Sequence, residues 1–230
     1  MATTRQGSSD VRPIGGQLQP ALGDFMRAPD SVLVRHAQDG IDQAFAVIVD
    51  RYHAGIYSLA YRMCGPTDAE DLTQEVFLKA LGKLDRFEFR NQASLRTWLY
   101  RIAMNSCINE LRRAKRRRSL EGPSLDAVIH TDDGAVRRTA PDESCMPHVI
   151  AEREETREIV HEIIRRMSPK YQQVLVLIDL EGMEYEEAAE VIGCRIGTVK
   201  SRLSRAREHF ASKLRAHMRA PRNHDIKQAR

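Results

Sequence analysis

The sequence has no apolar run long enough to cross a membrane. None of its hydrophobic stretches approaches the roughly 18 residues that a transmembrane helix needs. The first residues, MATTRQGSSDVRPIGGQLQP, also lack the short hydrophobic segment of a secretory signal peptide. We therefore expect a cytoplasmic protein without membrane insertion.

Cysteine, aromatic residues and net charge are also scarce. The cysteines are Cys64, Cys107, Cys145 and Cys194. They are far apart, and none forms a CxxC pair, so we favour reduced thiols that pack as small hydrophobic groups over a metal site or a disulfide. Aromatic residues make up 6% of the chain and the net charge is +4. The distribution of charge along the chain is therefore more informative than its sum. We also expect no cofactor.

Composition along the chain divides it into two helical modules. Hydrophobic residues are 42% and charged residues 30%, and helical periodicity is interrupted where glycine and proline gather. We predict an all-α fold of two small helical domains joined by a flexible linker, the second containing a helix-turn-helix. The predicted segments are a flexible leader (1–29), a first module (30–118), a linker (119–150), a second module (151–218) and a basic tail (219–230).

In the first module we expect helices over about 31–38 and 42–64, and further helices starting near Thr67 and Ser94. Thr67 and Glu70 have the spacing of a capping box, which predicts that Thr67 caps the third helix. The apolar positions expected to face the core in that helix are Leu72, Val76, Phe77, Ala80, Leu81 and Leu84. In the last helix, Trp98 falls on the apolar side, which favours a structural role.

The second module contains the spacing of a helix-turn-helix between Tyr185 and Leu203. Ala189 is small where two helices cross, Gly193 can adopt positive φ at the turn, and Val199 can pack the second helix back. Residues 179–190 hold six acids, whereas residues 195–207 hold five basic residues and no acid. This separation of acidic and basic residues favours DNA binding by the second helix over an ordinary helical hairpin with a solvated basic face.

Three stretches together resemble the extracytoplasmic function (ECF) class of sigma-70-type sigma factors. They are DAEDLTQEVF (68–77), SLRTWLYRIA (94–103) and GTVKSRLSRAR (197–207). The resemblance implies that the first module is sigma region 2, which binds core RNA polymerase and opens the promoter −10 element. The second would be region 4, which reads the −35 element as duplex. It also implies no catalytic residues, because polymerase does the chemistry, and an anti-sigma factor as a further partner.

The acidic face of the third helix is the candidate polymerase interface. Its residues are Asp68, Asp71, Gln74 and Glu75, which recur three and four apart and so share one helix face. Without the resemblance, a solvated helix face is the usual fate of such charges.

Candidate −10 contacts come from a loop and the helix after it. The loop residues are Phe87, Phe89, Arg90, Asn91 and Gln92, which offer the aromatic faces and amides that a flipped base needs. For Phe87, a place in the core is an equal alternative. The helix residues are Arg96, Tyr100, Arg101, Asn105, Arg112 and Arg113. The last two open a basic run that can meet phosphate or remain solvated.

Candidate −35 contacts lie at the start of the final helix. They are Arg195, Thr198, Lys200, Ser201, Arg202 and Arg205. We expect Arg202 to read a base and Lys200 to bind phosphate, while Val199 and Leu203 turn inward. The alternative functions are a helix-turn-helix activator or repressor with a sensing first module, and a DNA-processing enzyme. Neither a sensing pocket nor a catalytic constellation is evident in the sequence.

Overall fold

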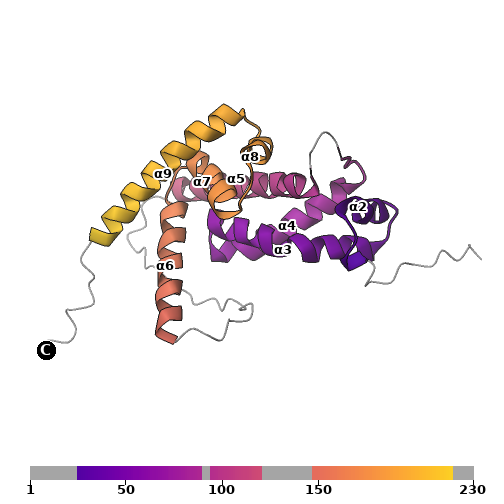
Figure 1. Cartoon of the computed structure of the whole chain (residues 1–230), viewed down its shortest axis with the longest axis horizontal. Helices are drawn as coiled ribbons and strands as arrows, with labels where there is room; N and C mark the ends of the chain where they lie inside the picture. Colours follow the sequence, from indigo (N-terminus) through magenta and orange to yellow (C-terminus); the bar gives the residue numbers. More distant parts are fainter. Residues whose placement is uncertain (1–24, 90–93, 121–146, 220–230) are drawn as a thin grey trace, which may run out of the picture.

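The computed structural model describes residues 25–89, 94–120 and 147–219 (Figure 1). The regular elements of these three ranges are all helical, which confirms the all-α prediction. The first module contains α2 (Asp30–Gln38), α3 (Asp42–Cys64), α4 (Pro66–Leu84) and α5 (Leu95–Leu120). The second contains α6 (Pro147–Arg165), α7 (Pro169–Leu175), the π-helical turn η1 (Val176–Leu180), α8 (Tyr185–Ile192) and α9 (Ile196–Arg219). Within the described ranges, no helix has both the length and the apolar character that crossing a bilayer requires.

The core of the first module lies between α3, α4 and α5, which all contact one another. Ile56, Leu59 and Leu99 are completely buried there. Their helical spacing gives each helix one apolar stripe, and the stripes meet along the module axis. Each such side chain stabilises the module by about 1.5–3 kcal/mol relative to an exposed one.

The turn between α3 and α4 corrects one sequence prediction. Thr67 does not cap α4, because the helix begins at Pro66, which occupies its first position. Gly65 takes the N-cap position with φ of 105°, a conformation that a residue with a Cβ rarely adopts. Proline is preorganised for a first helical position, and with Pro66 there Thr67 lies two residues after the N-cap, too late to act as the cap.

The ordered modules extend beyond the predicted boundaries. Phe25 is 2% exposed and packs edge-on against His36 of α2, so residues 25–29 belong to the first module and not to the leader. At the linker, α5 continues to Leu120 and α6 begins at Pro147, ahead of the predicted start at residue 151. The rest of the predicted leader, linker and tail (1–24, 121–146 and 220–230) lies outside the described residues.

The second module has the predicted helix-turn-helix. Gly193 ends α8 with φ of 73°, and α9 begins at Ile196. Val199 and Leu203 are buried, as expected for residues that pack the second helix onto the first. The Ser168-Pro169 restart is also confirmed, because α7 begins at Pro169.

The two modules pack against each other, and their buried residues form one continuous core. In Figure 1, α8 lies beside α5, and α6 meets the end of α3. The η1 turn also contacts α3. Gln172 of α7 is 1% exposed and donates to the backbone carbonyls of Met63 (2.8 Å) and Arg62 (3.2 Å). These carbonyls belong to the last turn of α3, where no helical partner exists. The predicted flexible linker would let the modules move independently, whereas the structure shows them docked in this form, which we call the closed arrangement.

Candidate polymerase and nucleic-acid interfaces

The predicted polymerase-binding residues all lie on α4, and they differ in their surroundings. Asp71 and Gln74 are exposed, while Asp68 and Glu75 are half-buried. Glu75 forms an ion pair with Lys79, which also donates to the Ser106 hydroxyl of α5 at 3.0 Å. Partial burial and then the charge of nearby Glu110 raise the pKa of Asp68. The face is therefore acidic, and Asp71 and Gln74 are its exposed members. The Gln74 amide also donates to the Glu70 carboxylate at 3.3 Å.

An apolar groove lies beside this acidic face, between α3 and α4. It is lined by Phe45, Val49, His53, Thr73, Gln74, Phe77, Leu78 and Leu81. Leu78 is 70% exposed and Leu81 is 49% exposed, so Leu81 does not face the core as its spacing predicted. The buried stripe of α4 continues through Val76, Ala80 and Leu84 at spacings of four, and Leu81 lies one residue off that stripe, on the side of the groove. Exposed leucines in a groove mark a surface suited to a protein partner.

The predicted base-capture loop is divided by burial. Phe87 is 6% exposed and packs 4.7 Å from the Trp98 ring, which supports the core alternative for Phe87 and the structural role of Trp98. Phe89 is 46% exposed, with its ring edge-on to Phe87 at 4.9 Å. Phe89 is thus the aromatic face that this loop presents to solvent. Arg90, Asn91 and Gln92 lie outside the described residues.

The predicted −10 residues of α5 fall into two groups. Arg101, Asn105, Arg112 and Arg113 are exposed along the helix. Arg96 and Tyr100, in contrast, lie under the second module, and Tyr100 is only 3% exposed. Arg113 and Arg117 both pair with Glu110, at 3.6 and 2.6 Å, so part of the basic run is neutralised locally.

Glu181 of the second module occupies the position next to Arg96 and Tyr100. Its carboxylate accepts a hydrogen bond from the Tyr100 hydroxyl at 2.8 Å and forms an ion pair with Arg62 of α3. Arg96 donates to the Glu181 backbone carbonyl at 2.7 Å and lies 3.7 Å from the Glu187 carboxylate. Burial and then the Glu181 charge raise the pKa of Tyr100, so this phenol remains a donor. We call Arg62, Arg96, Tyr100 and Glu181 the Glu181 cluster.

A glycine in α3 makes room for this cluster. A Cβ at Gly55 would lie well inside van der Waals contact with the Tyr100 hydroxyl. The position is helical, so a larger residue would be tolerated by the backbone but not by Tyr100. Gly55 therefore allows the phenol of Tyr100 to lie close to α3. The position of this phenol in turn sets where its hydroxyl meets the Glu181 carboxylate.

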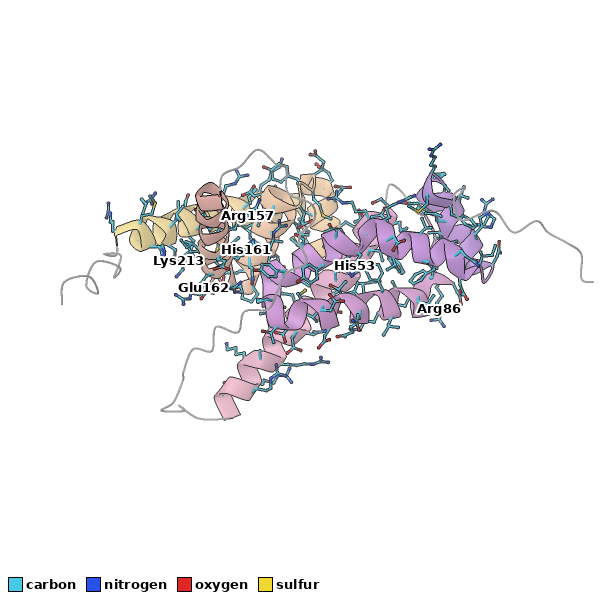
Figure 2. All side chains as sticks on the ribbon, turned by 90° about the horizontal axis from the view of Figure 1, so that it is seen from below. His53, Arg86, Arg157, His161, Glu162 and Lys213 are labelled. Atoms are coloured by element: carbon cyan, nitrogen blue, oxygen red, sulfur yellow. The ribbon has the colours of Figure 1, made fainter. Side chains whose placement is uncertain are left out.

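His161 lies where α6 meets α3, and its ring is edge-on to Tyr61 at 5.0 Å. Its Nδ1 is buried and has no hydrogen-bond partner among the described residues. Burial first, and then the charges of Arg62 and Arg165, lower the pKa of His161 to about 4. Figure 2 shows it at the same end of the molecule as Lys213 of α9, opposite the end that holds Arg86. The closed arrangement therefore holds this histidine neutral near pH 7.

The predicted −35 residues lie together at the start of α9. Arg195, Lys200, Ser201 and Arg205 are exposed, and Thr198 and Arg202 are half-buried. Lys200 lies 5.4 Å from the centroid of the Tyr185 ring, a cation–π contact across the helix-turn-helix. Arg207, further along, is held by a two-pronged ion pair with Asp179 at 2.6 and 3.0 Å. The N-terminal part of α9 thus presents exposed basic side chains, whereas Arg207 is held in an ion pair within the module.

Sequence reasoning missed Arg62, Gln172 and Glu181. All three act between modules, and Arg62 and Glu181 are 119 positions apart in the chain. Periodicity describes a residue relative to its own helix, so it carries no signal for such a pair. In the sequence, Glu181 is one of the six acids of residues 179–190, and nothing in that run indicates its partner.

Comparison with known proteins places both modules in one family. Residues 48–117 match the model of Sigma-70 region 2, and residues 157–210 match that of Sigma-70, region 4. The ECF RNA polymerase sigma-E factor of Escherichia coli (strain K12) is 36% identical over 186 residues, which cover 80% of this chain and 94% of that protein.

Solved structures agree with this assignment. CnrH in complex with the cytosolic domain of CnrY has a TM-score of 0.58 at 26% identity, covering 81% of this chain and 97% of that one. The sigma factor RpoE in complex with the anti-sigma factor NepR from Bartonella quintana has a TM-score of 0.56 at 25% identity, covering 74% and 96%. The chain is an RNA polymerase sigma factor and belongs to the ECF class of the sigma-70 family.

Proposed function

We propose that this sigma factor binds core RNA polymerase through α4 and directs initiation at promoters whose −10 and −35 elements it recognises with separate modules. The observation that carries the proposal is the exposed basic start of α9 in a helix-turn-helix, on a chain that also carries an acidic, leucine-lined face on α4. A basic recognition helix suits duplex DNA, and an acidic face with apolar neighbours suits a protein partner.

For the −35 element, the exposure of α9 supports the residue assignment. Arg202 lies one turn beyond Thr198, and a guanidinium at that position can fork onto a guanine edge. Lys200 suits a phosphate contact, because its ammonium is a point charge held above Tyr185. The other members of the proposed duplex-reading set are Arg195, Thr198, Ser201 and Arg205.

For polymerase and the −10 element, the first module supplies the proposed contacts. Asp71 and its neighbours on α4 would meet the polymerase, and Phe89 would stack on an unpaired base. Arg101, Asn105, Arg112 and Arg113 would follow the DNA backbone along α5. In this proposal the polymerase supplies the chemistry and the protein acts in the cytoplasm. An anti-sigma factor is a further proposed partner, as NepR is for RpoE of Bartonella quintana.

The test is reconstituted transcription. The full chain is added to core RNA polymerase from the same organism, and initiation is mapped on a library of its promoters. We expect defined start sites that core polymerase alone does not produce. Starts that are identical with and without the chain would refute the proposed function.

A further inference from the structure

Three donors of the first module converge on one residue of the second, Glu181. Arg96 and Tyr100 are four residues apart on α5, so they project from the same helix face, and Arg62 reaches the same point from α3. The Glu181 side chain is 8% exposed and accepts from both Arg62 and Tyr100, while its backbone carbonyl accepts from Arg96. Guanidinium groups and a phenol are also the donors that bind phosphate oxygens.

The first module contributes the cations of this cluster, and the second contributes the acids. Among the described residues, the ion pair of Arg62 is with Glu181 and that of Arg96 is with Glu187. Separation of the modules would therefore leave two guanidinium groups and a phenol directed toward water. The Arg96 guanidinium also lies over the Tyr100 ring, 5.3 Å from its centroid, so these two donors support each other's position.

We infer that Arg62, Arg96 and Tyr100 form a binding pocket for a backbone phosphate of single-stranded promoter DNA, and that Glu181 occupies this pocket in the closed arrangement. The inference rests on the proposed −10 function. A polyanion fits better than a small anion, because exposed Arg101 and Asn105 continue from the pocket along α5. Glu181 then acts as an internal competitor, and DNA binding requires the modules to separate.

The competition predicts a measurable gain when the Glu181 charge is removed. The apparent affinity for DNA is the intrinsic affinity reduced by the fraction of molecules that are open. Glu181→Gln keeps the shape but replaces a charged acceptor with a neutral one, which weakens the hydrogen bonds from Arg62 and Tyr100. We expect single-stranded DNA to bind about tenfold more tightly, equivalent to about 1.4 kcal/mol.

The experiment uses the full chain and fluorescently labelled oligo(dT) of about a dozen nucleotides, with binding followed by anisotropy over a range of salt. Glu190→Gln is the matched control, because Glu190 is an exposed acid of the same module outside the cluster. We expect the control to gain less than about twofold, by general electrostatics only. Adding Arg62→Gln to Glu181→Gln should remove the gain and flatten the salt dependence by about 0.7 of a unit of slope.

Hydrogen exchange supplies a readout that does not depend on affinity. Binding of oligo(dT) to the wild-type chain should raise amide exchange in η1 and α8, because α8 loses its contact with α5 and η1 loses its contact with α3. The Glu181→Gln variant should show raised amide exchange in η1 and α8 even when no DNA is present. Circular dichroism shows whether each variant keeps its helices.

Three results would overturn the inference: equal gains for Glu181→Gln and Glu190→Gln, no effect of Arg62→Gln in the Glu181→Gln background, or DNA binding without a change in exchange. Failure of the proposed function is seen separately. If the wild-type chain directs initiation with core polymerase but the variants behave in one of these ways, the pocket is wrong and the function stands. If it directs no initiation at all, the proposed function fails.

Discussion

Replacing Gln172 with leucine tests the closed arrangement with the least change of shape. The side-chain amide is 1% exposed and donates to two carbonyls at the end of α3, at 2.8 and 3.2 Å. Leucine fills nearly the same space but leaves both carbonyls against an apolar group. A buried acceptor that loses its partner costs about 1–3 kcal/mol. Because both carbonyls gain access to water when the modules open, we expect Gln172→Leu to destabilise the closed arrangement by about 2 kcal/mol in total.

That cost falls on docking, since both carbonyls and the amide lie across the module boundary. A loss of about 2 kcal/mol corresponds to roughly a thirtyfold shift of the closed–open equilibrium. Hydrogen exchange should increase at the end of α3 and in α7 and α8, with much less change in the core of α4. The urea midpoint of the second module should also fall, because its docked surface becomes exposed more often.

The matched control is Gln173→Leu. Gln173 is the next residue on α7 and is half-buried, and its side chain has no hydrogen bond among those found in the described residues. Equal exchange in the two variants would show that the added leucine, and not the lost amide, causes the change. Exchange indistinguishable from wild type in Gln172→Leu would refute the view that this side chain joins the modules.

The remaining predictions concern the other interfaces. Asp71→Lys together with Glu75→Lys should weaken binding to core polymerase with little loss of helicity, as measured by co-elution and circular dichroism; normal binding would mean that the interface is on another face. Arg202→Ala should reduce discrimination at one −35 base by about 1–3 kcal/mol, and Lys200→Ala should weaken all sequences alike, in binding assays across single-base changes and salt. A uniform loss for Arg202→Ala would instead assign it to phosphate. Because the pKa of His161 is lowered from 6.5 to about 4, the folded protein resists protonation there, and its stability should fall as pH drops from about 6.5 toward 4. The free energy of unfolding, measured with urea at each pH, should fall less steeply in His161→Gln than in the wild type. Identical curves for the two proteins would show that His161 does not cause the loss of stability.

Much of the fold was predictable because it depends on local chemistry. Gly193 and Ser168-Pro169 mark their turns correctly, since positive φ and a fixed proline φ are properties of single residues. Thr67 was misassigned because two helix-start signals overlapped and the proline was decisive. The inward side of α9 followed from spacing alone, as the burial of Val199 shows.

The relation between the modules was not predictable in the same way. The exposed or buried state of Tyr100 depends on a contact with Glu181, which lies beyond the predicted linker. Local periodicity placed Tyr100 on α5 correctly, yet the second module decides whether it faces water. Likewise, Leu81 had the spacing of a core residue, and only the position of α3 relative to α4 shows that it lines an open groove.

The π-helical turn gives the position of Glu181 a dependence on chain length. In η1 the Glu181 amide donates to the carbonyl of Val176, five residues earlier, at 2.9 Å. A π turn is equivalent to one extra residue in an α-helix. Deleting one residue here would restore α-helical bonding and rotate the following side chain by about 100° around the axis. The chain could keep both modules intact and still lose their contact, so the length of this turn sets how tightly the modules close without involving a recognition residue.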